Sequence, residues 1–136
     1  MNQIDMEELF MKALIAAQSA YAPYSRFRVG AALLGDDGEV YTGCNVENRS
    51  FGLTICAERT AVTKAVSEGQ RSFRALAVAA PDSDVPVSPC GACRQVLSEF
   101  MLHDAPVRFG GRTPLRTDTT IGGLLPYDSL HDLGRT

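Results

Sequence analysis

The chain has 136 residues, of which 45% are hydrophobic and 21% are charged. This composition is ordinary for a soluble globular protein, so we expect residues 1–136 to form a single domain. Lys and Arg number 13 against 16 Asp and Glu, which gives a formal net charge of -3. Nucleic-acid binding draws most of its affinity from phosphate neutralisation, so a mildly acidic chain without a basic run is a poor candidate for it.

The N-terminal segment has neither the basic start nor the unbroken apolar stretch of a signal peptide, because Asp5, Glu7, Glu8 and Lys12 interrupt it. No segment of the chain reaches the ~18 consecutive apolar residues that a membrane span needs. We therefore expect a cytoplasmic protein that makes no membrane contact. In a reducing compartment, cysteines serve more often as metal ligands or catalytic groups than in disulfides. The chain has four of them: Cys44, Cys56, Cys90 and Cys93.

The first third of the chain predicts a helix followed by a β-hairpin. The helix begins near Asp5, whose spacing to Glu8 resembles a capping box, and it ends before Pro23. Residues 27–34 form an apolar run typical of a strand. Residues 35–38 (Gly-Asp-Asp-Gly) are typical of a turn, and residues 39–46 form the returning strand.

The rest of the chain alternates helices and strands. Helical spacing predicts a helix over 56–68, with Gly69 as its C-cap, and a second helix over 91–102. Strands are expected over 73–80, 107–109 and, less regularly, 113–116. Residues 119–125 could form a helical turn, although two glycines make it costly. Strands joined by helices pair in parallel and a hairpin pairs antiparallel, so we expect an α/β fold with one mixed sheet.

Two short motifs carry the residues of chemical interest. Residues 56–58 are Cys-Ala-Glu, and residues 89–93 are Pro-Cys-Gly-Ala-Cys. The spacing of Cys90 and Cys93 lets both sulfur atoms reach one ion at a helix start, and Cys56 would join them from the other helix. Three protein ligands on a tetrahedral zinc ion leave the fourth position for water, as in catalytic sites. Zinc would make hydroxide available at neutral pH.

Glu58 lies two residues after one candidate ligand, so its carboxylate can reach the zinc-bound water without ligating the metal and can transfer its proton. Three thiolates oppose the acidity of that water, so positive charge is needed nearby. The helix N-termini supply part of it. Arg59 is the better candidate for the remainder, because Cys56 and Glu58 share its turn. Arg94 is equally well explained as a surface residue.

The two motifs together resemble the signature of the cytidine deaminase family, in its three-cysteine form. Residues 21–25 (Tyr-Ala-Pro-Tyr-Ser), 27–32 (Phe-Arg-Val-Gly-Ala-Ala) and 43–48 (Gly-Cys-Asn-Val-Glu-Asn) are similar to further segments of its small, homotetrameric nucleoside deaminases. The resemblance implies a three-layer α/β/α fold with a mixed five-stranded sheet and one zinc ion per subunit. It also implies deamination of cytidine and deoxycytidine in pyrimidine salvage, by attack of zinc-bound hydroxide at C4.

The resemblance also implies roles for individual residues. Asn45 and Glu47 would hydrogen-bond the ribose, and Phe27 would stack near the pyrimidine. The backbone of Ala57 would contact the base carbonyl, and the carbonyl of Ser88 would receive the departing ammonia. Family members form homotetramers in which a Phe near the C-terminus reaches a neighbouring site. Here no Phe follows Leu124, and Tyr127 or Leu130 would have to serve instead.

Other interpretations remain open on the residues alone. Cys44 could complete a closed four-cysteine structural site, but such a site leaves Glu58 unexplained. Phe27 could be a core residue, and Asn45 and Glu47 could be edge polar groups of the hairpin. The zinc chemistry would also suit a nucleotide, an antibiotic nucleoside or a nucleic acid as substrate. A third possibility is a zinc protein without catalytic activity.

Overall fold

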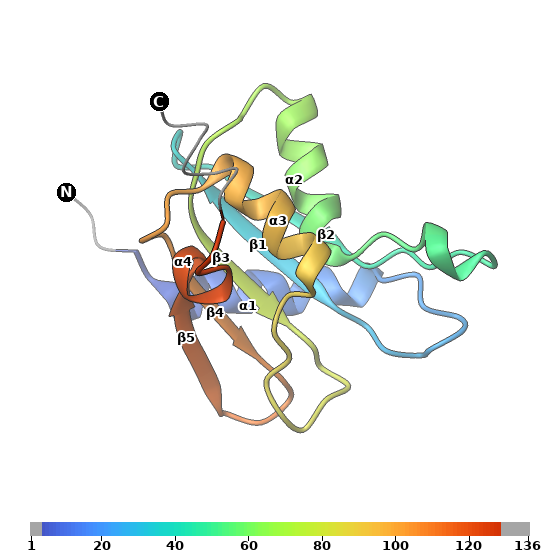
Figure 1. Cartoon of the computed structure of the whole chain (residues 1–136). Coiled ribbons are helices and arrows are strands. Elements are labelled where there is room, and N and C mark those ends of the chain that lie inside the picture. Colours follow the sequence, from blue (N-terminus) through green and yellow to red (C-terminus); the bar gives the residue numbers. More distant parts are fainter. Residues whose placement is uncertain (1–3, 129–136) are drawn as a thin grey trace.

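The computed structural model describes residues 4–128, which form one five-stranded sheet with helices on both faces (Figure 1). The elements in chain order are α1 (Met6–Ala16), η1 (Ala17–Ser19), β1 (Gly30–Gly35), β2 (Val40–Cys44), η2 (Phe51–Leu53), α2 (Ala57–Ser67), β3 (Phe73–Ala79), α3 (Gly91–Phe100), β4 (Pro106–Gly110), β5 (Arg116–Thr120) and α4 (Ile121–Leu124).

The sheet is mixed, as the sequence predicts. Its strand order is β2-β1-β3-β4-β5. Strand β1 pairs antiparallel with both β2 and β3, and β4 pairs antiparallel with β5. Strands β3 and β4 are joined through α3 and pair in parallel. A helical crossover returns the chain to the same edge of the sheet, which is why this pair alone is parallel.

Alternation along β3 divides the core into two layers. Ala75, Ala77 and Ala79 pack with Leu9 and other residues of α1 on one face. Leu76 and Val78 point to the opposite face, where they pack with residues of α2 and α3. Figure 1 shows α1 behind the sheet and α2 and α3 in front of it. The predicted three-layer arrangement of the family is therefore confirmed.

The local signals near the helix ends are also confirmed. Asp5 is the N-cap of α1, and its carboxylate accepts a hydrogen bond of 3.0 Å from the backbone N–H of Glu8. Gly69 follows α2 with a φ of +97°, a conformation that side chains with a Cβ rarely adopt. Within residues 4–128, none of the helices combines the length and apolar character needed to cross a membrane.

Several predicted boundaries were wrong. Strand β1 begins at Gly30, so Phe27 precedes it, and β2 ends at Cys44. The last strand is Arg116–Thr120 rather than 113–116, because its polar residues form an exposed edge without an apolar pattern. The short helix α4 follows, since the Thr120 side chain accepts a hydrogen bond of 3.0 Å from the N–H of Gly123.

Gly43 allows β2 to pack closely against the first turns of α2, the helix that carries Glu58. A Cβ atom at this position would lie 2.5 Å from the nitrogen of Ala61 and 2.7 Å from the oxygen of Ala57, both of them backbone atoms. We expect Gly43→Ala to lower the free energy of unfolding by about 2–3 kcal/mol, because α2 would have to move.

Urea unfolding measures this loss, and Gly52→Ala is the matched control. A Cβ atom at Gly52 would meet nothing within 4 Å, so that variant should stay within about 0.5 kcal/mol of the parent protein. Equal stability of the two variants would contradict the close packing of β2 on α2.

Candidate active site

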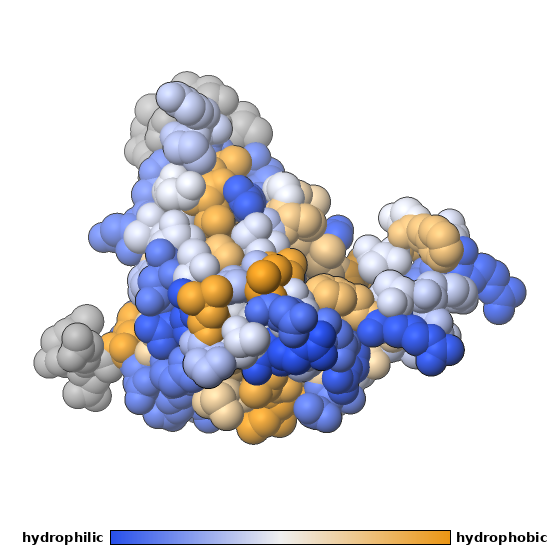
Figure 2. Space-filling view, turned by 90° about the horizontal axis from the view of Figure 1, so that it is seen from below, coloured by the Kyte–Doolittle hydropathy of each residue, from blue (hydrophilic) through white to orange (hydrophobic). Residues whose placement is uncertain are grey.

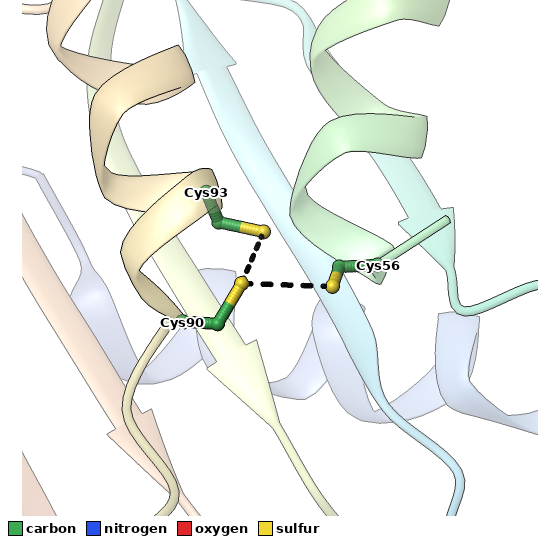
Figure 3. Close-up of side chains that lie close together, drawn as sticks. All are labelled: Cys56, Cys90 and Cys93. Atoms are coloured by element: carbon green, nitrogen blue, oxygen red, sulfur yellow. Dashed lines mark hydrogen bonds between the residues drawn. The ribbon is translucent and has the colours of Figure 1, made fainter. Parts of the chain in front are cut away.

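Three cysteine side chains from two helix starts meet in front of the sheet (Figure 3). Cys56 is the N-cap of α2, Cys90 is the N-cap of α3, and Cys93 lies in the first turn of α3. The sulfur of Cys90 is 3.8 Å from that of Cys56 and 3.5 Å from that of Cys93. The structure therefore brings together the three cysteines that the sequence motifs group as candidate ligands.

The spacing of the sulfur atoms fits one tetrahedral ion. Zinc binds thiolate sulfur at about 2.3 Å, and a tetrahedron of that size separates its sulfur ligands by about 3.8 Å. All three sulfur atoms lie within 4.8 Å of one another. Cys44 lies on β2 opposite Gly30 and is not among the metal-binding groups found in residues 4–128. The cluster thus offers three sulfur ligands.

Positive charge surrounds these sulfur atoms. Cys56 and Cys90 both occupy the N-cap of a helix, where the unpaired N–H groups carry partial positive charge. Nη2 of Arg59 donates a hydrogen bond of 3.3 Å to the sulfur of Cys56. This contact matches the charge-compensating position expected for Arg59.

The environment favours the charged form of one thiol in particular. The neighbouring Cys93 thiol, together with Arg59, lowers the pKa of Cys56 to about 5 despite its partial burial. The pKa of Cys93 is raised, because it lies beside the Cys56 sulfur and its side chain is buried. The hydrogen bond and the charge of Cys56 in turn raise the pKa of Arg59, which keeps the guanidinium charged. A preformed thiolate beside a fixed cation is suited to metal binding.

Glu58 is buried beside the cluster, on the first turn of α2, with only 5% of its surface exposed. Burial raises the pKa of its carboxyl group to about 7. A carboxyl group whose pKa lies near neutral pH can both take and return a proton at that pH. Buried glutamates are uncommon unless they are paired or functional, and this environment fits a proton-transfer residue.

A cavity of about 190 Å³ opens in front of Glu58. Several of the predicted site residues line it, and so do four residues that the sequence reasoning missed. The predicted residues are Asn45, Cys56, Ala57, Glu58, Ser88 and Cys90, and the four others are Val29, Thr54, Val78 and Val87. The apolar character of three of these four residues suits a flat, partly apolar ring.

Asn45 and Glu47 both direct their side chains toward the segment 24–29, although β2 ends before either residue. Asn45 accepts from the N–H of Val29 at 2.9 Å and donates to the carbonyl of Phe27 at 2.8 Å. Glu47 accepts from the N–H groups of Tyr24 and Ser25 at 3.0 and 3.2 Å and from the Ser25 hydroxyl. Both residues therefore shape the chain around the cavity.

Phe27 and Glu47 are not among the residues that line the cavity. A second connection fixes the segment that holds Phe27. The backbone N–H of Arg28 donates to Asp82 at 2.9 Å, and its guanidinium donates to the same carboxylate at 3.0 and 2.7 Å. Arg28 holds the pKa of Asp82 down at about 2, so at neutral pH this ionised pair ties the segment before β1 to the segment that follows β3.

Comparison with known proteins agrees with this geometry. Residues 4–108 match the model of the cytidine and deoxycytidylate deaminase zinc-binding region. The chain belongs to this family. Membership makes it a hydrolase of the cytidine deaminase type, and the three-thiol cluster agrees with one zinc ion per subunit.

Individual relatives are similar over most of their length. The cytidine deaminase of Sporosarcina psychrophila is 53% identical over 123 residues, which cover 90% of each chain. That of Mycobacterium tuberculosis H37Rv is 50% identical and covers 93% of this chain and 90% of its own. The crystal structure of cytidine deaminase from Burkholderia pseudomallei superimposes with a TM-score of 0.86 at 45% identity, covering 90% of this chain and 98% of that one. The deaminase fold is thus shared along nearly the whole chain.

Proposed function

We propose that this chain, acting as a single domain in the cytoplasm, hydrolyses free cytidine and deoxycytidine to uridine and deoxyuridine in pyrimidine salvage. The reaction consumes one water molecule and releases one ammonia. The observation that carries this proposal is the burial of Glu58 beside three convergent thiols at the base of a cavity. The printed names of the similar proteins support cytidine as the substrate.

In this proposal Cys56, Cys90 and Cys93 would hold the zinc ion, and Arg59 would offset the charge of their thiolates. When bound, the zinc ion would acidify a water molecule toward a pKa of ~7 and so supply the nucleophile. Glu58 would take one proton of the attacking water and pass it to the ring nitrogen while the water oxygen bonds to C4 of the pyrimidine. The same carboxylate would then take the second proton of that oxygen and pass it to the leaving amine as the C4–N bond breaks. Both water protons therefore end in the products, and the enzyme neither gains nor loses one.

The remaining cavity residues would orient the nucleoside. The backbone N–H of Ala57 would donate to the base carbonyl, and the carbonyl of Ser88 would accept from the departing amine. Phe27 would stack near the ring. Asn45 and Glu47 would bind the ribose hydroxyls. Asn45 has an amide N–H left for this contact, and the carboxylate of Glu47 has lone pairs left, because their internal hydrogen bonds do not use all of these groups. Anchored in this way, both residues would meet the sugar in a fixed orientation.

The carboxylate of Glu47 favours an unphosphorylated sugar, because it would repel a phosphate placed nearby. A nucleotide deaminase is the second candidate, since the matching family model includes deoxycytidylate deaminases. The loss of ultraviolet absorbance on deamination separates the two, with cytidine, deoxycytidine and their monophosphates as substrates.

We expect both nucleosides to be turned over with a kcat/KM about 100-fold or more above that of the monophosphates. Turnover of the monophosphates alone would favour the second candidate. If zinc-loaded protein deaminated none of the four compounds, both candidate functions would be excluded. The interpretation that remains would be a zinc protein without deaminase activity.

We also propose a homotetramer in which neighbouring subunits complete each site. A cavity of about 190 Å³ is smaller than the ~300–1,000 Å³ usual for ligand sites, so another surface has to close it. A projecting arm, residues 46–55, carries exposed apolar side chains including Phe51, Leu53 and Ile55. Figure 2 shows apolar surface on this arm beside hydrophilic groups. Tyr24 packs edge-on against Phe51, with ring centroids 5.6 Å apart.

Sedimentation at micromolar concentration should give a mass near four times the 14.6 kDa of one chain. Phe51→Asp should shift this equilibrium toward smaller species, because it would bury a charge in the interface. Val85→Asp changes a side chain of similar exposure outside the arm and is the control. A monomeric parent protein would contradict the assembly. The candidate replacement for the inter-subunit Phe at Leu130 falls outside the described residues, and Tyr127 is 94% exposed.

A further inference from the structure

Arg94 lies in the first turn of α3, next to Cys93, and its guanidinium makes three hydrogen bonds to other segments. Nε donates to the carbonyl of Pro89 at 2.8 Å, and Nη2 donates to the hydroxyl of Ser88 at 3.0 Å. Nη1 donates to the carbonyl of Leu124 at 2.9 Å. Because each of its three nitrogens donates a hydrogen bond, the guanidinium of Arg94 is held in one orientation and does not behave as a solvated surface charge.

The acceptors belong to two parts of the chain. Ser88 and Pro89 end the loop that leads to Cys90, and Ser88 lines the cavity. Leu124 is the last residue of α4, about 30 residues further along the chain. Arg94 therefore links the loop beside the metal ligands to α4, which packs against the same core.

The geometry determines which peptide group is held. Arg94 bonds the side chain of Ser88 and the carbonyl of Pro89, and the peptide group between these two contacts contains the carbonyl of Ser88. Pro89 is fully buried and its ring fixes φ, so the peptide has little freedom once both contacts are made. The direction of the Ser88 carbonyl is thereby set from both sides.

We propose that Arg94 is a positioning residue that aims the Ser88 carbonyl at the amine of the substrate. The inference rests on the proposed function, in which that carbonyl accepts from the departing amine. Arg94 itself is neither among the cavity-lining residues nor among the candidate metal ligands of residues 4–128. A misdirected carbonyl costs recognition of the amine, since a displacement of about 1 Å in a site can lower the rate by about 100-fold.

Arg94→Lys and Arg94→Gln test the inference, because neither side chain can make the three-pronged contact. We expect kcat/KM for cytidine to fall by about 10- to 100-fold in both variants. The inhibition constant of uridine should change by less than about threefold, since uridine lacks the amine that the carbonyl accepts from. Zinc content should stay at one per chain, and Arg71→Gln at an exposed position is the control.

Three outcomes would overturn the inference: parent-like kcat/KM in both variants, equal weakening of cytidine and uridine, or loss of zinc. The last two would indicate a general structural role. Ser88→Ala keeps the backbone carbonyl and removes one contact of Arg94. Made alone, it should cause part of the fall in kcat/KM seen in the Arg94 variants. Added to Arg94→Lys, it should lower kcat/KM little further. Additive losses would also count against the inference. An inactive parent protein would instead contradict the proposed function itself.

Discussion

Replacing Glu58 by glutamine is expected to lower kcat for cytidine by about 100- to 10,000-fold. The zinc content and the fold of the variant should stay unchanged. Glutamine has nearly the same shape but cannot take a proton, and general acid–base catalysis is worth about that much. The buried position and the raised pKa of Glu58 support this role. Steady-state kinetics and zinc analysis on the same samples measure both quantities.

Glu68→Gln is the matched control, because Glu68 is the exposed C-cap of the same helix. It should retain the activity of the parent protein. A Glu58→Gln variant with more than about a tenth of the parent activity would exclude Glu58 as the proton carrier.

Replacing Cys93 by alanine should abolish both zinc retention and deamination. Two remaining thiols cannot hold the ion against competition, and Cys93 is the fully buried member of the cluster. We expect less than about one tenth of a zinc ion per chain after gel filtration, with activity lowered in proportion.

Cys44→Ser distinguishes a three-thiol site from a four-thiol site. Cys44 lies on β2, outside the cluster of Cys56, Cys90 and Cys93. This variant should therefore keep a full zinc ion and most of its activity. Loss of zinc from it would revive the closed structural site, and normal zinc content in Cys93→Ala would remove that residue from the ligand set.

The sequence predicts the metal cluster well because its determinants are local. Cys56 and Cys90 each precede a helix whose periodicity is clear, and the starts of these two helices meet over the same face of the sheet. The position of Glu58 follows from that of Cys56 on the same turn. The helix start at Asp5 follows in the same way from a short capping pattern.

Features that depend on distant parts of the chain could not be predicted. One of the three bonds of Arg94 reaches Leu124, which the sequence places only in a weakly patterned region. Phe27 belongs to an apolar run but precedes β1, because Asn45 and Asp82 bind the backbone of this segment instead of a neighbouring strand. The strand at 116–120 is polar and lies on the sheet edge, so its pattern gives no signal.

The central claim is that three thiolates hold an open zinc site, and X-ray absorption at the zinc edge of the metal-loaded protein tests it most directly. We predict three sulfur neighbours at about 2.3 Å and one oxygen or nitrogen neighbour at about 2.0 Å. The oxygen position is the one from which water would attack. Four sulfur neighbours and no lighter atom would show a closed structural site and would contradict this account.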